Sequence, residues 1–226
     1  MFATLSSRRY LQPAASIAYP HPKVPTMSST RAPDGAVSGD AERLLHFNRQ
    51  LIDQALALLA AHETPGAPAY EQYTGPHLRH VIEHYEALVL RDTDSIVDYD
   101  RRPRDRDVER DASVARARLS ALKQHLAEWS DASLEQSLNV HGQGGPAGEF
   151  DFVTRSSVGR ELVFLASHAI HHFALLQVYC EQQGIALDPN FGLAPSTAAH
   201  ALGAGAGNPS TASTKESVCP TSQPAA

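Results

Sequence analysis

The amino-acid sequence predicts an all-α protein, a four-helix bundle with long crossover connections and disordered termini. Four stretches repeat apolar residues at intervals of three and four, the spacing that gives a helix one apolar face. Segments that carry proline and glycine, or many charges, separate these stretches. Four amphipathic helices joined by long connections are typical of a four-helix bundle, whose facing helices commonly build metal sites.

The first two helices are delimited by capping residues, proline and glycine. We expect the first helix to begin at Asp40, whose carboxylate can cap the free amides, and to end near His62. The second opens at Thr74, with Pro76 in its first turn where a missing amide costs nothing, and ends near Arg91. The apolar face of the first helix consists of Leu44, Leu51, Ile52, Ala55, Leu58 and Leu59.

The third and fourth helices have equally regular apolar spacing. The third begins near Asp107, and the fourth begins at Ser156 or Ser157 and ends with Gly184 in the position after the C-cap. The seam of the third helix has spacings of three and four, and it consists of Ala115, Leu119, Leu122, Leu126 and Trp129.

The connections around the third helix are polar or irregular. Residues 94–106 read as a polar connection. Residues 134–140 alternate weakly in polarity, and a glycine-rich turn follows at residues 142–146. This pattern predicts a short β-hairpin before the last helix.

Both ends of the chain are too poor in apolar residues to form a core. The sequence before Asp34 has no acidic residue and a charge of +4, and the sequence after residue 193 is rich in Ala, Gly, Ser, Thr and Pro. Neither end can bury enough apolar area to offset the entropy of ordering it. We therefore expect a disordered extension at residues 1–37, one helical domain at 38–193 and a disordered low-complexity tail at 194–226.

Charge and cysteine content narrow the classes of partner. The net charge of -6 is spread over mixed sequence, and residues 101–111 hold five arginines and four acids, so no nucleic-acid footprint is expected. We also expect no membrane span, which needs about 18 apolar residues. The two cysteines, Cys180 in a predicted helix and Cys219 in the tail, suit a reducing compartment.

The N-terminal composition leaves the cellular location open between two alternatives. Residues 1–31 contain arginine and serine but no acid, as organelle transit peptides do, although four prolines interrupt any helix there. Met27 offers a second start position. A cytoplasmic protein with a plain extension and an organellar protein of the mitochondrion or plastid are both consistent with this segment.

Two histidine clusters are the residues that point most directly to chemistry. Six of the twelve histidines lie within residues 77–84 and 168–172. His168 and His172 are four residues apart on a helix, which places their β-carbons about 5–6 Å apart on one face. With His80 from the second helix they form the strongest candidate for a three-histidine metal site. Three protein ligands leave coordination positions for water or substrate.

Imidazole ligands do not select one metal, and histidines also have ordinary structural uses. Zinc, nickel, iron and copper all accept imidazole, and we expect a divalent zinc, nickel or iron ion. The structural alternative is that these histidines bond to the backbone and to Glu83 or Glu161. Glu161 lies two helical turns before His168, where it could orient a ligand or act as a catalytic base, or pair with Arg155 or Arg160.

Several motifs together resemble the DinB/YfiT-like family of four-helix-bundle metalloenzymes. They are the His-x-x-His-His group at residues 168–172, Gly-Pro-His-Leu-Arg-His at 75–80, Asp-Tyr-Asp-Arg at 98–101 and Gly-Arg-Glu-Leu at 159–162. The resemblance covers about residues 43–184. It implies that His80, His168 and His172 are the ligands and that His77, His84 and His171 are only their neighbours. The family's thiol-cofactor site is not recognisable here, and no cofactor other than a metal is expected.

Residues and resemblance together lead to a functional expectation. The chain is expected to be a metal-dependent hydrolase or group transferase that acts on a small-molecule substrate, with the metal on His80, His168 and His172 and Glu161 as the catalytic group. The alternative is a non-enzymatic metal-stabilised bundle that acts as a structural or dimerisation module, in a homodimer.

Overall fold

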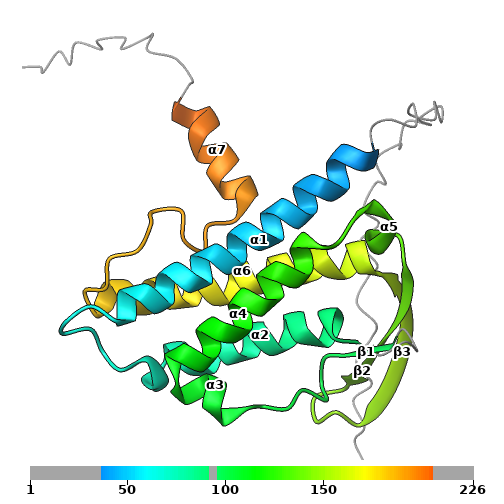
Figure 1. Ribbon diagram of the computed structural model, residues 1–226, viewed down its shortest axis with the longest axis horizontal. Coiled ribbons are helices and arrows are strands. Elements are labelled where there is room, and N and C mark those ends of the chain that lie inside the picture. Colours follow the sequence, from blue (N-terminus) through cyan, green and yellow to red (C-terminus); the bar gives the residue numbers. More distant parts are fainter. Residues whose placement is uncertain (1–36, 92–95, 206–226) are drawn as a thin grey trace, which may run out of the picture. The chain divides into compact units, whose positions relative to one another are not determined.

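The computed structural model describes residues 37–91 and 96–205 as seven α-helices, a 3-10 turn and a three-stranded sheet. The expected extension and most of the expected tail lie outside these residues, as do Met27 and Cys219. A mainly helical fold is therefore correct, with a small sheet in addition (Figure 1).

Two long helices, α1 (Val37–His62) and α2 (Thr74–Val89), begin and end close to the predicted positions. The 3-10 turn η1 (Tyr70–Gln72) lies between them. The prediction that Asp40 caps α1 is wrong: the helix begins three residues earlier, and Asp40 lies in its first turn, where it pairs with Arg43 at 2.8 Å.

The predicted third helix is two helices that meet at a sharp boundary. Helix α3 (Arg106–Arg110) ends at Asp111, whose extended backbone and carboxylate then cap α4 (Ala112–Ala127) by accepting from the amide of Ser113. The predicted seam is buried along α4, whereas Trp129 follows the end of that helix. A four-residue helix, α5 (Asp131–Leu134), comes next.

The last long helix, α6 (Val158–Gln182), has the predicted caps. Ser157 is its N-cap and accepts from the amide of Arg160, and Gly184 follows the C-cap with a φ of +72°. Helix α7 (Pro195–Gly205) lies within the segment expected to be disordered.

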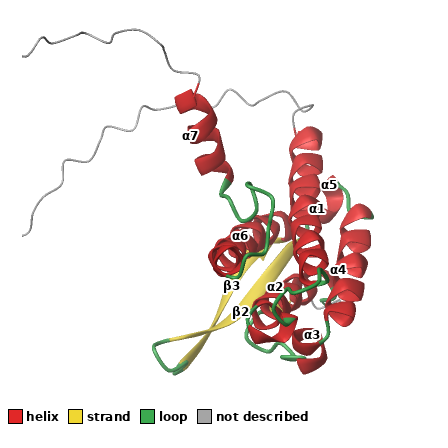
Figure 2. Ribbon diagram, turned by 90° about the vertical axis from the view of Figure 1, so that its left-hand side faces the viewer, coloured by secondary structure: helices red, strands yellow, loops and turns green. Residues whose placement is uncertain are grey.

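The expected hairpin exists and is longer than predicted. Strand β2 (Ser137–Gly144) pairs antiparallel with β3 (Phe150–Ser157), and its far end extends away from the helices (Figure 2). A third strand, β1 (Ile96–Asp98), pairs parallel with β2 in a segment expected to be only a connection. Sheet order β1-β2-β3 fixes the loop after β1 against the helices that carry the histidines.

The helices share one apolar core. Helix α1 packs against α4 and α6, and α2 packs against α4, α6 and α3 (Figure 1). Among the fully buried side chains are those of Leu58, Leu78, Tyr85, Leu119 and Phe173. This packing fixes α2 and α6 side by side, so residues 90 positions apart in sequence face each other.

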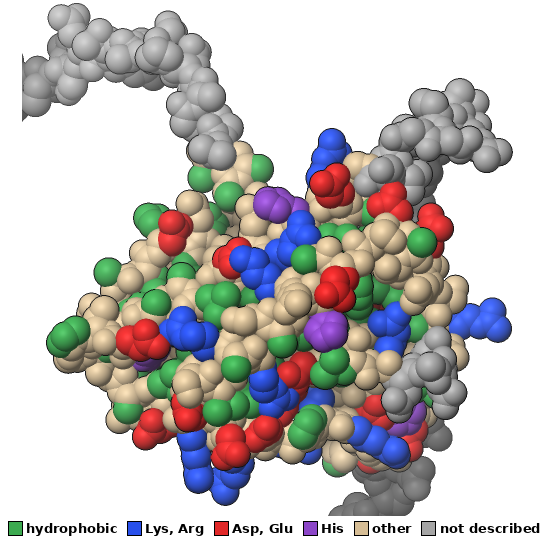
Figure 3. All heavy atoms as spheres, viewed as in Figure 1, with side chains coloured by type: hydrophobic (Ala, Val, Ile, Leu, Met, Phe, Trp, Pro, Cys, Tyr) green, Lys and Arg blue, Asp and Glu red, His purple; other side chains and the backbone are tan. Residues whose placement is uncertain are grey.

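Helix α6 bears on the expectation of no membrane span. Its sequence is long and apolar enough to cross a membrane by length and composition alone, a property that buried core helices can share. In this fold the buried apolar residues of α6, such as Leu162, Leu165 and Phe173, pack into the core that α1 and α2 share. The side chains of Val163, Leu175 and Val178 are exposed. On the face shown in Figure 3, acidic and basic side chains are interspersed.

Candidate metal centre

The facing surfaces of α2 and α6 bring the two histidine clusters together. Positions 77, 80 and 84 lie on one face of α2, and positions 168 and 172 lie on one face of α6. The two faces meet where the helices pack. Burial of Leu78 and Ile82 on one flank and of Leu165 and Ala169 on the other holds these faces together.

The structure brings the three predicted ligands next to one another. The ring centroids of His80 and His168 are 5.0 Å apart, those of His80 and His172 are 4.7 Å apart, and those of His168 and His172 are 4.7 Å apart. The rings therefore form a nearly equilateral triangle across the two helices.

His84 also belongs to this cluster, although the family resemblance had placed it outside. One nitrogen each from His80, His84 and His168 lie within 4.8 Å of one another. The Nδ1–H of His84 donates to the carbonyl of His80 at 2.7 Å, so the neutral ring keeps a lone pair on Nε2. The signal was in the sequence: His80 and His84 have the same four-residue spacing as His168 and His172.

His77 and His171 extend the cluster on its other side. The Nδ1 atoms of His77 and His172 are 2.9 Å apart, which makes one ring the donor and the other the acceptor. The ring of His171 lies 5.5 Å from that of His172, and the residue is exposed. His77 thus orients His172, while His171 is a surface neighbour.

One buried nitrogen of the cluster has no hydrogen-bond partner among the residues that the structure describes. Nε2 of His168 is buried, and within the described residues it makes no hydrogen bond. A buried polar atom without a partner costs free energy unless something else satisfies it. A divalent cation fits this nitrogen and the imidazoles around it, because neutral imidazole is its common ligand.

Burial keeps these rings neutral. Desolvation is the largest cause in each case, and it lowers the pKa of His80 and His172 to about 3 and that of His84 to about 4. The same cause lowers the pKa of His77 and His168. All five rings are therefore deprotonated at neutral pH, as ligation requires.

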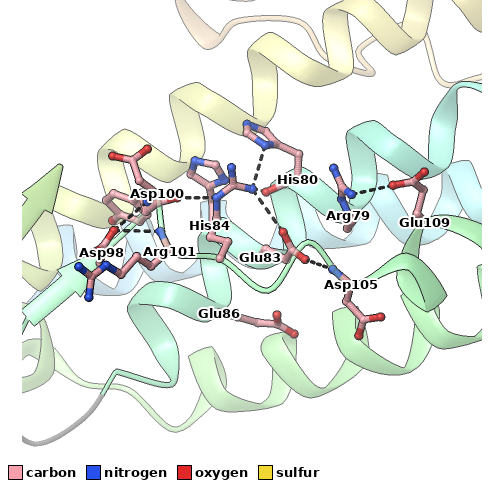
Figure 4. Close-up of polar contacts among 12 residues, drawn as sticks. Arg79, His80, Glu83, His84, Glu86, Asp98, Asp100, Arg101, Asp105 and Glu109 are labelled. Atoms are coloured by element: carbon pink, nitrogen blue, oxygen red, sulfur yellow. Dashed lines mark hydrogen bonds and ion pairs between the residues drawn. The ribbon is translucent and has the colours of Figure 1, made fainter. Parts of the chain in front are cut away.

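A buried ion pair lies directly beside His80. Nη1 of Arg102 donates to Nδ1 of His80 at 3.0 Å and contacts Oε2 of Glu83 at 3.3 Å. The other oxygen of Glu83 accepts from the amide of Asp105 at 2.7 Å (Figure 4). Glu83, which the structural alternative offered as a partner of a histidine, thus holds an arginine, a contact that sequence reasoning missed.

Glu161 lies behind the cluster and does not bond a histidine among the described contacts. Its carboxylate, 6% exposed, accepts from the hydroxyls of Tyr99 at 2.8 Å and Ser156 at 2.5 Å. Tyr99 in turn stacks on His84, with ring centroids 5.4 Å apart. Glu161 therefore fixes Tyr99 against the cluster, and its partners are not the arginines considered from sequence.

Hydrogen bonds to the side chain of Asp98 fix the loop that follows β1. Asp98 accepts from the amides of Asp100 and Arg101 at 2.9 and 3.0 Å (Figure 4). It also accepts from Nδ1 of His141 at 2.8 Å. Cys180 is fully buried, and burial raises its pKa to about 11, which suits the expected core position.

Comparison with known proteins gives one informative similarity. The chain is similar to FK506-binding protein 5 of Rhizopus delemar, with 29% identity over 162 residues, which are 72% of this chain and 41% of that protein. The chain thus spans less than half the length of this relative. No family model matches the chain, and no solved structure matches it.

This similarity overturns the family assignment made from the motifs. The resemblance to DinB/YfiT-like proteins is wrong, because the relative found carries the name of an FK506-binding protein and no DinB model matches. The predicted function, a DinB-like metal-dependent hydrolase or transferase, is wrong for the same reason. Short histidine motifs on helices recur in unrelated proteins, so their spacing alone could not identify a family.

Proposed function

We propose that the helical domain binds a divalent transition-metal ion through His80, His168 and His172, with His84 as a fourth imidazole. The observation that carries the proposal is Nε2 of His168, which is buried in a group of neutral imidazoles and makes no hydrogen bond within residues 37–91 and 96–205. His80 and His168 are the central ligands of the proposed site. Both belong to the triangle of rings with His172 and to the group of nitrogens that includes His84.

The donor set supports zinc, nickel or iron as the ion. The cluster offers imidazole nitrogens, whereas magnesium and calcium prefer oxygen ligands. When bound, the ion would join α2 to α6, and part of its binding free energy would stabilise the fold.

We further propose that α1, α2, α4 and α6 act as the four-helix bundle around this site, because each of them packs against two others.

Calorimetric titration of zinc into protein purified without a histidine tag tests the proposal. We expect one equivalent to bind the wild type. His168→Ala should abolish binding. His84→Ala and His172→Ala should each weaken it at least about tenfold, because the loss of even an outer contact to a metal ligand commonly costs that much affinity. His171→Ala is the matched control, because that ring is an exposed neighbour on the same turn. Failure of the wild type to bind would refute the proposal.

The name of the relative makes FK506 binding a second candidate function. What supports it is the identity across 72% of this chain. The geometry supports it less well: the cavity of about 440 Å³ beside α2 is lined mainly by charged side chains, and drug-sized ligands prefer apolar pockets. Titrating FK506 into the same protein separates the candidates, since saturable binding unaffected by His168→Ala would place a drug site away from the histidines.

A further inference from the structure

Arg102 is the one charged side chain that hydrogen-bonds a ring of the histidine cluster among the described residues. Its side chain is 10% exposed, and its guanidinium bonds Nδ1 of His80, the carboxylate of Glu83 and, through Nε, the carbonyl of Tyr99. A cation is an unusual neighbour for a site that takes another cation, because like charges repel strongly where water is excluded.

The hydrogen bond to His80 also competes with ligation. Because Arg102 can only donate, Nδ1 of a neutral His80 accepts, and its proton lies on Nε2. A metal and Arg102 cannot use the same lone pair of His80 at one time. Ligation by that nitrogen therefore frees Nη1 of Arg102 beside the ion, while Glu83 still holds the guanidinium.

The charges around such an ion do not balance. A divalent ion and Arg102 bring three positive charges, and Glu83 is the one carboxylate that the described contacts place on this guanidinium. Both oxygens of Glu83 are already used, by Arg102 and by the amide of Asp105. The imidazoles add no charge, because an imidazole that ligates a metal is neutral.

We propose that the site binds an oxyanion, such as a carboxylate, together with its metal, and that Arg102 is the residue that holds this anion. The inference rests on the proposed function. The anion would take a coordination position on the ion and accept from Arg102, the charge-assisted geometry that guanidinium favours. It would supply the negative charge that the protein ligands lack.

Titration of acetate into the cobalt(II)-loaded protein at fixed ionic strength tests the inference, because the visible absorption of cobalt changes when its ligands change. We expect a saturable spectral change for the wild type. Arg102→Gln should weaken acetate binding about tenfold or more, the loss of one charge-assisted hydrogen bond, without weakening cobalt binding. Arg101→Gln is the matched control, because the Arg101 side chain is 83% exposed on the same loop.

Two further arms keep the outcomes distinct. The double variant Arg102→Gln/Glu83→Gln avoids leaving a buried carboxylate unpaired, and it should lose acetate binding equally. Inorganic phosphate in place of acetate shows whether a larger oxyanion is accepted. Cobalt binding with no acetate response, or with equal responses in wild type and Arg102→Gln, would overturn this inference alone. Absence of cobalt binding in the wild type would instead refute the metal site itself.

Discussion

His77 on α2 and His172 on α6 meet through their Nδ1 atoms at 2.9 Å. This hydrogen bond fixes the ring plane of a proposed ligand from the neighbouring helix, as outer contacts of metal-bound histidines commonly do. Because burial lowers the pKa of both rings, the bond joins two neutral imidazoles.

We predict that His77→Phe weakens zinc binding about tenfold, the usual cost of losing such an orienting contact. The aromatic ring keeps the packing against Tyr73, whose centroid is 4.7 Å from that of His77. Calorimetry with zinc measures the change. An affinity equal to that of the wild type would show that His172 needs no orienting partner.

Stability should depend on pH through the buried histidines. Their folded pKa values of about 3 to 4 for His80, His84 and His172 lie below the unfolded value of about 6.5, so the unfolded chain binds more protons between these limits. The free energy of unfolding therefore falls as the pH falls below about 6.5. Urea unfolding with a metal chelator present, at pH 7 and pH 4.5, measures it, and His84→Asn should reduce the difference.

The low pKa values of the buried histidines also lower the pH at which protons begin to displace the metal. Protons compete with a metal for free imidazole below about pH 6, but for rings with a pKa near 3 to 4 the competition begins only at lower pH. We expect zinc to be retained at pH 5 as long as the fold persists. Metal content after gel filtration at pH 5 checks this, with circular dichroism as the control for folding.

A close approach between α2 and α3 should make Gly75 irreplaceable. A β-carbon at this position would lie 1.9 Å from the carbonyl oxygen of Glu109, a backbone atom that cannot move alone. We predict that Gly75→Ala lowers the free energy of unfolding by about 1–3 kcal/mol, the usual cost of overpacking. In α1, Gly39 has nothing within 4 Å, so Gly39→Ala should instead stabilise by about 0.5–1 kcal/mol.

A buried hydrogen bond links α1 to α2. The hydroxyl of Tyr85 donates to the side-chain oxygen of Asn48 at 2.8 Å, and both residues are almost fully buried. Tyr85→Phe leaves that oxygen without this donor, so we predict a loss of about 1–3 kcal/mol in urea unfolding. A loss under about 0.5 kcal/mol would mean that water replaces the hydroxyl.

Local sequence signals were sufficient for the long helices. Apolar spacing located α1, α2 and α6, and Ser157 and Gly184 marked both ends of α6 correctly. The boundary at Asp111 was missed because it has no glycine or proline, and an aspartate reads as a helix cap only once the chain is known to turn there.

Long-range relationships were not predictable in this way. Strand β1 is three residues long and pairs with residues 139–141, more than 40 positions later, so nothing local identifies it. The contact of Arg102 with His80 likewise depends on where the loop after β1 lies, which the sheet decides. His84 was on the correct helix face, and the family resemblance, not the spacing, excluded it.

X-ray absorption at the zinc edge of the loaded protein tests the central claim most directly, because it counts the ligands around the metal. The account predicts a first shell of nitrogen and oxygen at about 2.0–2.1 Å, with the outer-shell scattering of at least three imidazoles and no sulfur. A shell with sulfur, or with fewer than three imidazoles, would contradict a metal site built from His80, His168, His172 and His84.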